Sequence, residues 1–269
     1  MITYEEAYQK VMQYHLDYGT EAVGLLEAVG RVLAIDIKAD RDFPPFDRST
    51  KDGIAIAFDA FTGEGNQFKV EGVLPAGTPR AELFDKNNCL EIMTGAVVPK
   101  GADTIVMYED ITIADGHAAL NKNPTLGQNI HFQGSDVRQG ATVLYQNTKI
   151  SAAEIGVLAA VGIAQVLVKK LPRITLISTG NELVDVWEMP LPHQIRKSNM
   201  QSLYAALSEE GIVPQQIHLN DELEDTRYGL QKAVKENDVL LLSGGVSKGK
   251  YDYIPLVMEQ LGVQKVFHM

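Results

Sequence analysis

The sequence predicts a multidomain protein of the α/β and β classes, and three patterns along its 269 residues support that prediction. After Pro172, apolar strand-like runs alternate with helical segments, which is typical of a mostly parallel sheet covered by helices on both faces. Residues 54–130 hold short alternating strands separated by Gly, Pro and Asn, the pattern of a small β-rich unit. Helical patterns lie on both sides of that unit, at residues 3–17 and 151–161.

The N-terminal segment predicts two helices, and the second of them runs into a strand. Residues 3–17 have an amphipathic pattern, and Thr3 with Glu6 three positions later forms a capping box. Residues 25–37 predict a short helix leading into a strand. The Pro-rich stretch that follows, RDFPPFDRST, predicts a break before the β-rich unit.

The second half of the sequence predicts strands and helices that alternate regularly. Residues 151–161 predict a helix with Ser151 as N-cap and Glu154 closing a capping box. The predicted strands lie at residues 174–178, 215–220 and 238–243, and the predicted helices at 199–210, 223–236 and 253–261. Gly211 is expected to end one of these helices. Residues 263–268 predict the start of a further strand, and because a parallel domain cut there would expose an edge, we expect the chain to be truncated.

Composition restricts the classes of function. Hydrophobic residues make up 45% and charged residues 22%, so a sizeable core is available. A net charge of −11 argues against nucleic-acid binding but leaves room for a local anion pocket. The single cysteine, Cys89, forms no intrachain disulfide and indicates a reducing compartment. No signal peptide, membrane span or zinc-type histidine spacing is present, so we expect a cytoplasmic protein without membrane partners.

The strongest local signal is LLLSGGVSKGKYDYI, in which a buried strand runs into a Gly-rich loop and then a helix. Glycines allow backbone N–H groups to point at an anion, and the next helix adds a positive dipole end. The candidate phosphate ligands are Ser243, Gly244, Gly245 and Ser247, with Lys248 or Lys250 adding positive charge. The loop lacks the Walker spacing, which disfavours ATP hydrolysis. A tight strand-to-helix turn without a ligand is the alternative.

The loop STGNEL follows the first strand of the same alternating region. Thr179 and Gly180 could donate hydrogen bonds there, and the carboxylate of Glu182 suits magnesium beside a phosphate. The alternative for Glu182 is a turn cap. Asp221 and Asp252 each lie just beyond a parallel strand or its loop and could ligate metal, although Asp252 could equally be a helix N-cap.

Other polar loops are less specific. In IRKSN, Arg196 and Lys197 could bind an anion, but a solvated pair before an N-cap at Ser198 is the stronger interpretation. Asp52, Thr94 and Asp136 lie in polar loops at strand edges, and local propensity assigns no chemistry to them.

Six motifs together resemble one family, the molybdopterin molybdenumtransferases, which include bacterial MoeA and the E domain of gephyrin. The motifs occur in the family's order and spacing over essentially all 269 residues: FPPFDRSTKDGIAI, IMTGAVVPKGADTIVMYED, NIHFQGSDVRQG, ISTGNELV, IRKSN and LLLSGGVSKGKYDY. Lys51 stands where the family motif commonly has Met. The family also continues beyond this sequence into a PGKP-type segment, whose lysines help to hold the anionic ligand, and a last β-barrel domain.

The resemblance implies a fold and an activity. Residues 1–41 and 133–170 would form a linker and dimerisation domain, residues 42–132 an inserted β-rich domain, and residues 171–269 an incomplete three-layer α/β molybdopterin-binding domain. The family forms homodimers, with the active site between the α/β domain of one protomer and the β-rich domain of the other. It uses magnesium to insert molybdate into adenylylated molybdopterin, with release of AMP.

The resemblance also implies roles for individual residues. The residues that match the family's catalytic positions are Asp52, Thr94, Asp136, Glu182, Asp221 and Asp252, and the metal-binding subset is Glu182, Asp221 and Asp252. The residues expected to bind the pterin ligand are Thr179, Gly180, Ser198, Asn199, Ser243, Gly244, Gly245, Val246 and Ser247. Magnesium, helix N-termini and loop N–H groups would offset the repulsion between the two anionic substrates.

Two other functions stay open at this level. The chain could be a non-catalytic module that binds molybdopterin, or a nucleotide-modifying enzyme of the CinA type built on the same α/β domain. The β-rich insertion with TGAVVPKGAD argues against the CinA type. Nothing in the sequence supports a gephyrin-like scaffolding role.

Overall fold

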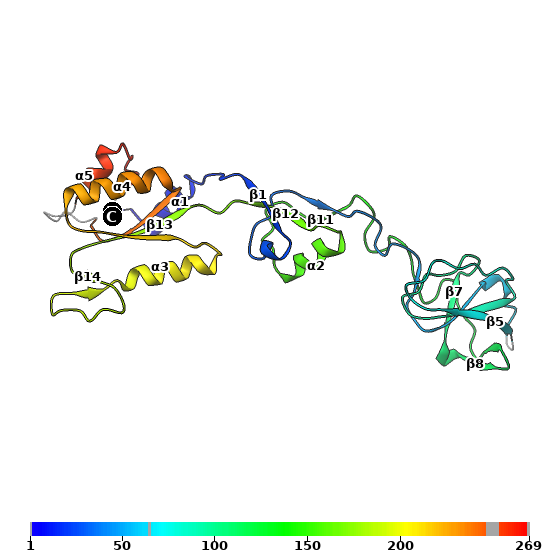
Figure 1. Cartoon of the computed structure of the whole chain (residues 1–269). Coiled ribbons are helices and arrows are strands. Elements are labelled where there is room, and N and C mark those ends of the chain that lie inside the picture. The colour runs from blue at the N-terminus through cyan, green and yellow to red at the C-terminus, as the bar shows by residue number, and fades with distance from the viewer. Residues whose placement is uncertain (1, 64–65, 246–252, 268–269) are drawn as a thin grey trace. The chain divides into compact units, whose positions relative to one another are not determined.

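The computed structural model describes residues 2–63, 66–245 and 253–267 (Figure 1). The chain divides into two compact units. The first contains Met1–Ile35, Gln146–Ile155 and Ala164–Met269, and the second contains Asp36–Tyr145 and Gly156–Ile163. Within the described residues, no helix has the length and apolar character needed to cross a membrane.

A three-stranded parallel sheet organises the α/β part of the first unit. Its central strand, β13 (Ile174–Thr179), is buried along its whole length and lies between β16 (Gln215–Leu219) and β17 (Val239–Ser243). Side chains of alternating residues enter two cores, as strand geometry requires. Leu176 contacts the core beneath α3 (Ser198–Glu209), and Ile177 contacts the core beneath α4 (Leu223–Glu236) and α5 (Ile254–Gln260). Figure 1 shows α3 on one side of the sheet and α4 with α5 on the other.

The other elements of the first unit are short. Strand β1 pairs antiparallel with β12, and β14 pairs with β15 beside the parallel sheet. The bounds are α1 (Tyr4–Met12), β1 (Thr20–Gly24), η1 (Leu26–Ala28), β12 (Gln165–Lys169), β14 (Leu183–Val184) and β15 (Ile195–Arg196). Helix α2 (Ala152–Ala160) belongs to the first unit up to Ile155 and to the second from Gly156. It begins after Ser151, whose backbone N–H donates to Glu154 as the capping-box pattern predicts.

The second unit is built on a six-stranded mixed sheet in the order β7-β4-β6-β5-β9-β8. Its strands are β4 (Gly53–Ile56), β5 (Gln67–Leu74), β6 (Asn88–Ile92), β7 (Thr104–Met107), β8 (Ile111–Ala114) and β9 (His117–Leu120). Two short pairs join the segments that flank the sheet: β2 (Ile37–Lys38) with β11 (Thr142–Leu144), and β3 (Arg48–Ser49) with β10 (Ile130–His131). The predicted β-rich unit is therefore confirmed.

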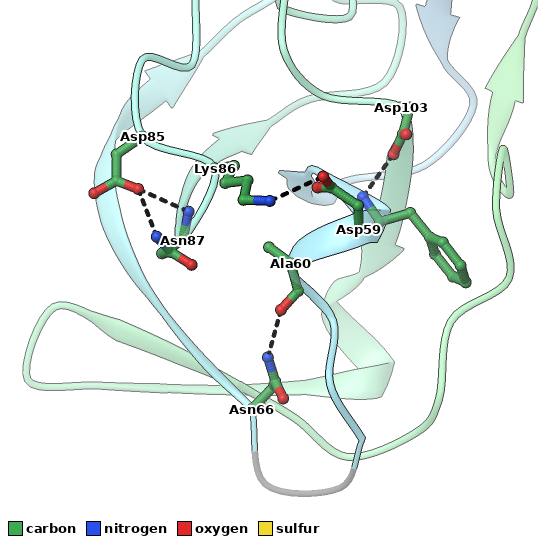
Figure 2. A network of polar contacts seen from close by, with 8 residues as sticks. Asp59, Ala60, Asn66, Asp85, Lys86, Asn87 and Asp103 are labelled. Atoms are coloured by element: carbon green, nitrogen blue, oxygen red, sulfur yellow. Dashed lines mark hydrogen bonds and ion pairs between the residues drawn. The ribbon is translucent and has the colours of Figure 1, made fainter.

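A polar network holds the turn η2 (Phe58–Ala60), which follows β4 (Figure 2). The carboxylate of Asp103 accepts a hydrogen bond of 2.7 Å from the backbone N–H of Phe58. The ammonium of Lys86 donates to Asp59 at 3.0 Å. Because the Phe58 N–H has no partner within a regular ladder, a side-chain carboxylate satisfies it instead. The second short turn, η3 (Tyr108–Asp110), connects β7 to β8.

Several predicted elements are confirmed. The capping box of Thr3 and Glu6 is present at the start of α1. Gly211, at φ +75°, follows the end of α3 as predicted. The three predicted strands of the parallel sheet and the helices α4 and α5 all form, with small shifts at their ends.

Four local predictions are wrong. Helix α1 ends at Met12 rather than near residue 17, because none of its residues is buried and a short helix gains little stability alone. In residues 25–37 the predicted helix is reduced to the turn η1, although the predicted strand begins at their end as β2. There the N–H of Gly30 donates to Ile150 O, so tertiary pairing replaces the helical ladder. Residues 263–267 form no strand. The N-cap of α3 is Lys197, and Ser198 is already helical.

Candidate functional site

The carboxyl edge of the parallel sheet gathers three of the predicted loops. In open parallel sheets this edge is where ligands bind. The loop after β13 and the loop after β16 are joined reciprocally: Asn181 N–H donates to Asp221 Oδ2 at 3.1 Å, and Asp221 N–H donates to Asn181 Oδ1 at 3.3 Å. Asp221 is therefore held beside the STGNEL loop.

The loop after β17 passes directly over the end of β13. Gly244 and Gly245 both have positive φ, +98° and +65°. A Cβ on Gly244 would lie 2.9 Å from Thr179 O, and one on Gly245 would lie 2.7 Å from Thr179 Oγ1. Only glycine fits this close approach. The hydroxyl of Thr179 is buried and has no hydrogen-bond partner among the described residues, so it can donate to a ligand. Val246, Ser247 and Asp252 lie outside the described residues.

Two carboxylates stand at the same edge. Gly180, at φ +126°, allows the side chain of Glu182 to fold back, and a Cβ on Gly180 would lie 2.5 Å from Glu182 Oε2. Among the described residues, the side chain of Asp221 accepts a hydrogen bond from Asn181 through one oxygen only. The donors present are therefore oxygen atoms with spare capacity, which is the set that magnesium prefers. Within the described ranges no three His, Cys, Asp or Glu side chains form a group that could hold a metal ion.

The start of α3 closes one side of this edge. Asn199 Nδ2 donates to Ser243 Oγ at 3.2 Å and so connects the helix to the end of β17. Ser198 and Asn199 are exposed. A small cavity of about 60 Å³ lies here, lined by residues that include Ser178, Arg196, Asn199 and Ser243. Of the predicted ligand-binding residues, Ser198 and Asn199 of α3 are thus brought together with Ser243 at the end of β17.

A polar pair that the sequence did not reveal lies beside that cavity. Ser178 Oγ and His218 Nδ1 are 2.9 Å apart on neighbouring strands. Lys197 Nζ donates to Asp185 at 3.1 Å, and both line a second cavity of about 120 Å³ with His218. Burial first, and then the charge of Lys197, lower the pKa of His218. Only the strand register brings Ser178 and His218 together, and sequence spacing does not show it.

The loop between β14 and β15 projects from the same region. It carries Trp187, whose side chain is 78% exposed. Arg196 Nε donates to Glu188 O at 3.1 Å, which ties the loop to a residue that lines the smaller cavity.

In the second unit, Asp52 and Thr94 form one contact. Thr94 donates to Asp52 Oδ1 through its backbone N–H at 2.6 Å and through its hydroxyl at 2.8 Å. These two hydrogen bonds, the backbone one first, hold the pKa of Asp52 below its usual value. Nearby, burial and then the hydrogen bond to Glu91 raise the pKa of Tyr108 to about 12. Asp52 is thus an ionised, fixed and exposed carboxylate.

Asp136 belongs to a chain of three side chains. His131 Nε2 lies 2.8 Å from Asp136 Oδ1, and His131 Nδ1 lies 3.2 Å from Arg48 Nη2. The sequence singled out Asp136, but not its link to Arg48, because Arg48 and His131 are 83 positions apart and meet through the pairing of β3 with β10. The described site residues therefore form two groups, one in each unit.

Comparison with protein families gives two matches that together span nearly the whole chain. The family described as "MoeA N-terminal region (domain I and II)" matches residues 2–162. The family described as "Probable molybdopterin binding domain" matches residues 175–269.

Among curated proteins, the chain is similar to molybdopterin molybdenumtransferases. It is 38% identical to that of Synechocystis sp., with 100% of this chain and 70% of the relative covered. It is 33% identical to those of Staphylococcus epidermidis and Bacillus subtilis, with 99% of this chain and 65% and 64% of the relatives covered. The chain thus spans about two thirds of the length of these relatives.

The chain is also similar to solved structures of a MoeA protein. The crystal structure of the molybdopterin biosynthesis MoeA protein from Pyrococcus horikoshii superposes with a TM-score of 0.86 at 31% identity, covering 99% of this chain and 68% of that one. A second structure of that protein gives a TM-score of 0.81 over 91% of this chain and 66% of that one. The multidomain α/β and β architecture predicted from the sequence is thereby confirmed.

Proposed function

Because the chain belongs to the molybdopterin molybdenumtransferase family of molybdenum cofactor biosynthesis, we propose that it inserts molybdate into adenylylated molybdopterin with magnesium and releases AMP. The observation that carries this proposal is the close passage of Gly244 and Gly245 over Thr179. It creates a strand-end loop where backbone N–H groups and a buried, unpartnered hydroxyl can receive a phosphate.

Glu182 and Asp221 are the described residues that would hold magnesium. Their free carboxylate oxygens match the hard-cation preference, and Asp252 is proposed as a third ligand. When bound, the ion would neutralise charge on the phosphoanhydride and on molybdate. The chain's own contribution is to hold Asp221 through Asn181 and to keep the carboxylate of Glu182 at the end of β13.

The other predicted residues are proposed to orient the ligand or to accept hydrogen bonds from it. Asn199, fixed to Ser243, and Ser198 would orient the pterin ligand at the start of α3. Asp52, fixed by Thr94, supplies an ionised carboxylate that can accept hydrogen bonds from ligand or water. The expected setting is the cytoplasm, in keeping with the free thiol of Cys89.

We further propose that the active form is a homodimer. Helix α1 buries none of its residues, and Tyr4, Tyr8 and Val11 expose apolar surface on one face. Such a face on a short amphipathic helix needs a partner to gain stability. A second copy of the chain is the proposed partner.

The test is release of AMP from adenylylated molybdopterin with molybdate, measured with and without magnesium. We expect magnesium-dependent release that falls by about 100-fold in Gly244→Ala, since the added methyl displaces the loop donors. Gly156→Ala is the matched control, because its Cβ would meet nothing within 4 Å in α2. Molybdopterin binding by calorimetry without any AMP release would show a binding role in place of the transferase activity.

A further inference from the structure

The backbone around Asp136 is held firmly by the segment before β3. Asp136 N–H donates to Phe43 O at 3.0 Å, and Gly134 N–H donates to Pro44 O at 3.0 Å. Gln133 N–H donates to the carboxylate of Asp47 at 2.8 Å. With the main chain fixed in this way, the rotamer of its side chain is what decides where the Asp136 carboxylate points.

His131 is the side chain that sets this rotamer. Its Nε2 lies 2.8 Å from Asp136 Oδ1, while Asp136 Oδ2 has no hydrogen-bond partner in the described part of the chain. The side chain of Asp136 is 55% exposed, whereas that of His131 is 29% exposed. An exposed carboxylate without such a donor would sample several staggered rotamers.

The chemistry of the two partners fixes the tautomer of His131. A guanidinium has only N–H donors, so His131 Nδ1, 3.2 Å from Arg48 Nη2, must accept. An ionised carboxylate only accepts, so His131 Nε2 must carry the proton. A proton on both nitrogens would place two donors face to face at Arg48. The neighbouring acids Asp42 and Asp47 accept backbone N–H groups of the same loop instead of binding the imidazole.

We propose that Arg48 and His131 are positioning residues for Asp136: Arg48 holds His131 as the neutral Nε2–H tautomer, and His131 aims the free oxygen of Asp136 outward as an acceptor. The contacts of His131 with Arg48 and Asp136 are sufficient to support the tautomer and its effect on Asp136. The consequence for turnover rests on the proposed function, in which Asp136 is a site carboxylate. Histidines that bind metals or take part in catalysis are often oriented in the same way: a hydrogen bond to one ring nitrogen fixes which tautomer the other ring nitrogen presents.

Nitrogen NMR of the folded protein, with its histidine rings isotopically labelled, shows which ring nitrogen of His131 carries the proton. At neutral pH we expect the His131 resonances of a protonated Nε2 and an unprotonated Nδ1, assigned by their loss in His131→Gln. Arg48→Met should convert this pattern to a mixture of the two neutral tautomers. Arg41→Met is the control, because Arg41 pairs with Asp40 and not with His131. A major Nδ1–H form, or a pattern that Arg48→Met leaves unchanged, overturns the proposal.

A pair of amide variants tests the effect on Asp136. Glutamine places its amide where Nε2 lies and can still donate to Asp136, whereas asparagine reaches only the Nδ1 position. We expect His131→Gln to retain AMP release and His131→Asn to lose 10- to 100-fold in kcat with a smaller change in KM. Equal losses in both variants, at unchanged thermal stability, overturn the positioning role. If the unmodified chain releases no AMP, the proposed function fails, while the NMR result still decides the tautomer.

Discussion

At the scale of single residues, the contact between Thr94 and Asp52 makes a measurable prediction. Two hydrogen bonds from Thr94 lower the pKa of Asp52, with the backbone N–H contributing more than the hydroxyl. Thr94→Val removes only the hydroxyl, so the pKa of Asp52 should rise and still stay below its usual value. Thr94→Ser keeps the donor and should leave the pKa nearly unchanged. Carboxyl-carbon NMR titration measures both, and an unmoved pKa in Thr94→Val would contradict the contact.

Individual site residues were predictable from motifs, but their partners were not. Asp52 and Thr94 were both named from the sequence, yet they are 42 positions apart, and only the fold shows that one fixes the other. Ser178 and His218 were not predicted, because their contact depends on the register of two parallel strands. Periodicity tells which residues face a core, but it does not tell which neighbouring strand a residue meets.

At the scale of elements, Gly53 in β4 decides how closely β7 can approach. A Cβ at that position would lie 2.0 Å from Val106 O, inside the backbone of the neighbouring strand. Gly53→Ala should therefore destabilise the second unit by about 3 kcal/mol, since the clash is with main chain that cannot rotate away. Urea unfolding followed by circular dichroism measures the loss.

The control for that substitution lies in the same sheet. Gly72 is in β5, and a Cβ there would lie 3.7 Å from Leu90 Cδ2, an ordinary contact. Gly72→Ala should stay within about 1 kcal/mol of the unmodified protein, because alanine suits a strand interior at least as well as glycine. Equal losses for the two variants would show that the close approach at Gly53 is not the cause.

Elements with purely local signals were predicted best. The capping box at α1 and the glycine after α3 depend on neighbours within a few positions, and both form. Residues 25–37 were predicted as a short helix that runs into a strand, and of these only the strand forms, as β2, while the helix is reduced to the turn η1. In the fold, Leu33 N–H donates to Thr148 O, and this long-range pairing overrides the local preference.

At the scale of the whole molecule, the ion pair between Arg173 and Asp238 should make the free energy of unfolding depend on pH under acidic conditions. Arg173 donates to Asp238 from its guanidinium at 2.9 and 3.1 Å and from its backbone N–H at 2.9 Å. The guanidinium first, and then the backbone, lower the pKa of Asp238 from 3.8 to about 2. A carboxyl whose pKa is depressed by folding stabilises the protein above its unfolded pKa, and that contribution is lost as pH falls toward the folded value.

The corresponding substitution is Asp238→Asn. It should lower the thermal midpoint at neutral pH and flatten its dependence on pH between about 4 and 2. Asp59→Asn is the matched control, because in the described part of the chain Asp59 pairs only with the exposed ammonium of Lys86. Parallel pH curves for Asp238→Asn and the unmodified chain would refute the assignment.

The proposed homodimer is also a property of the whole molecule. Tyr4 and Tyr8 stack on the exposed face of α1, with ring centroids 6.3 Å apart. Replacing Tyr8 and Val11 by Asp should halve the mass measured by light scattering, because charges would have to be buried in the contact. Gln9→Asp adds charge to an exposed polar position of the same helix and should leave the mass unchanged. A protein that is monomeric without any substitution would refute this part of the proposal.

The 78% exposure of Trp187 has a practical consequence, because it is the sole tryptophan of the chain. Its indole already meets water in the native state, so unfolding changes its surroundings little. Tryptophan emission should therefore stay almost flat while circular dichroism records the collapse of both units, and a flat fluorescence melt would be mistaken for heat resistance. Conversely, a blue shift in that emission signals that something has covered the loop between β14 and β15.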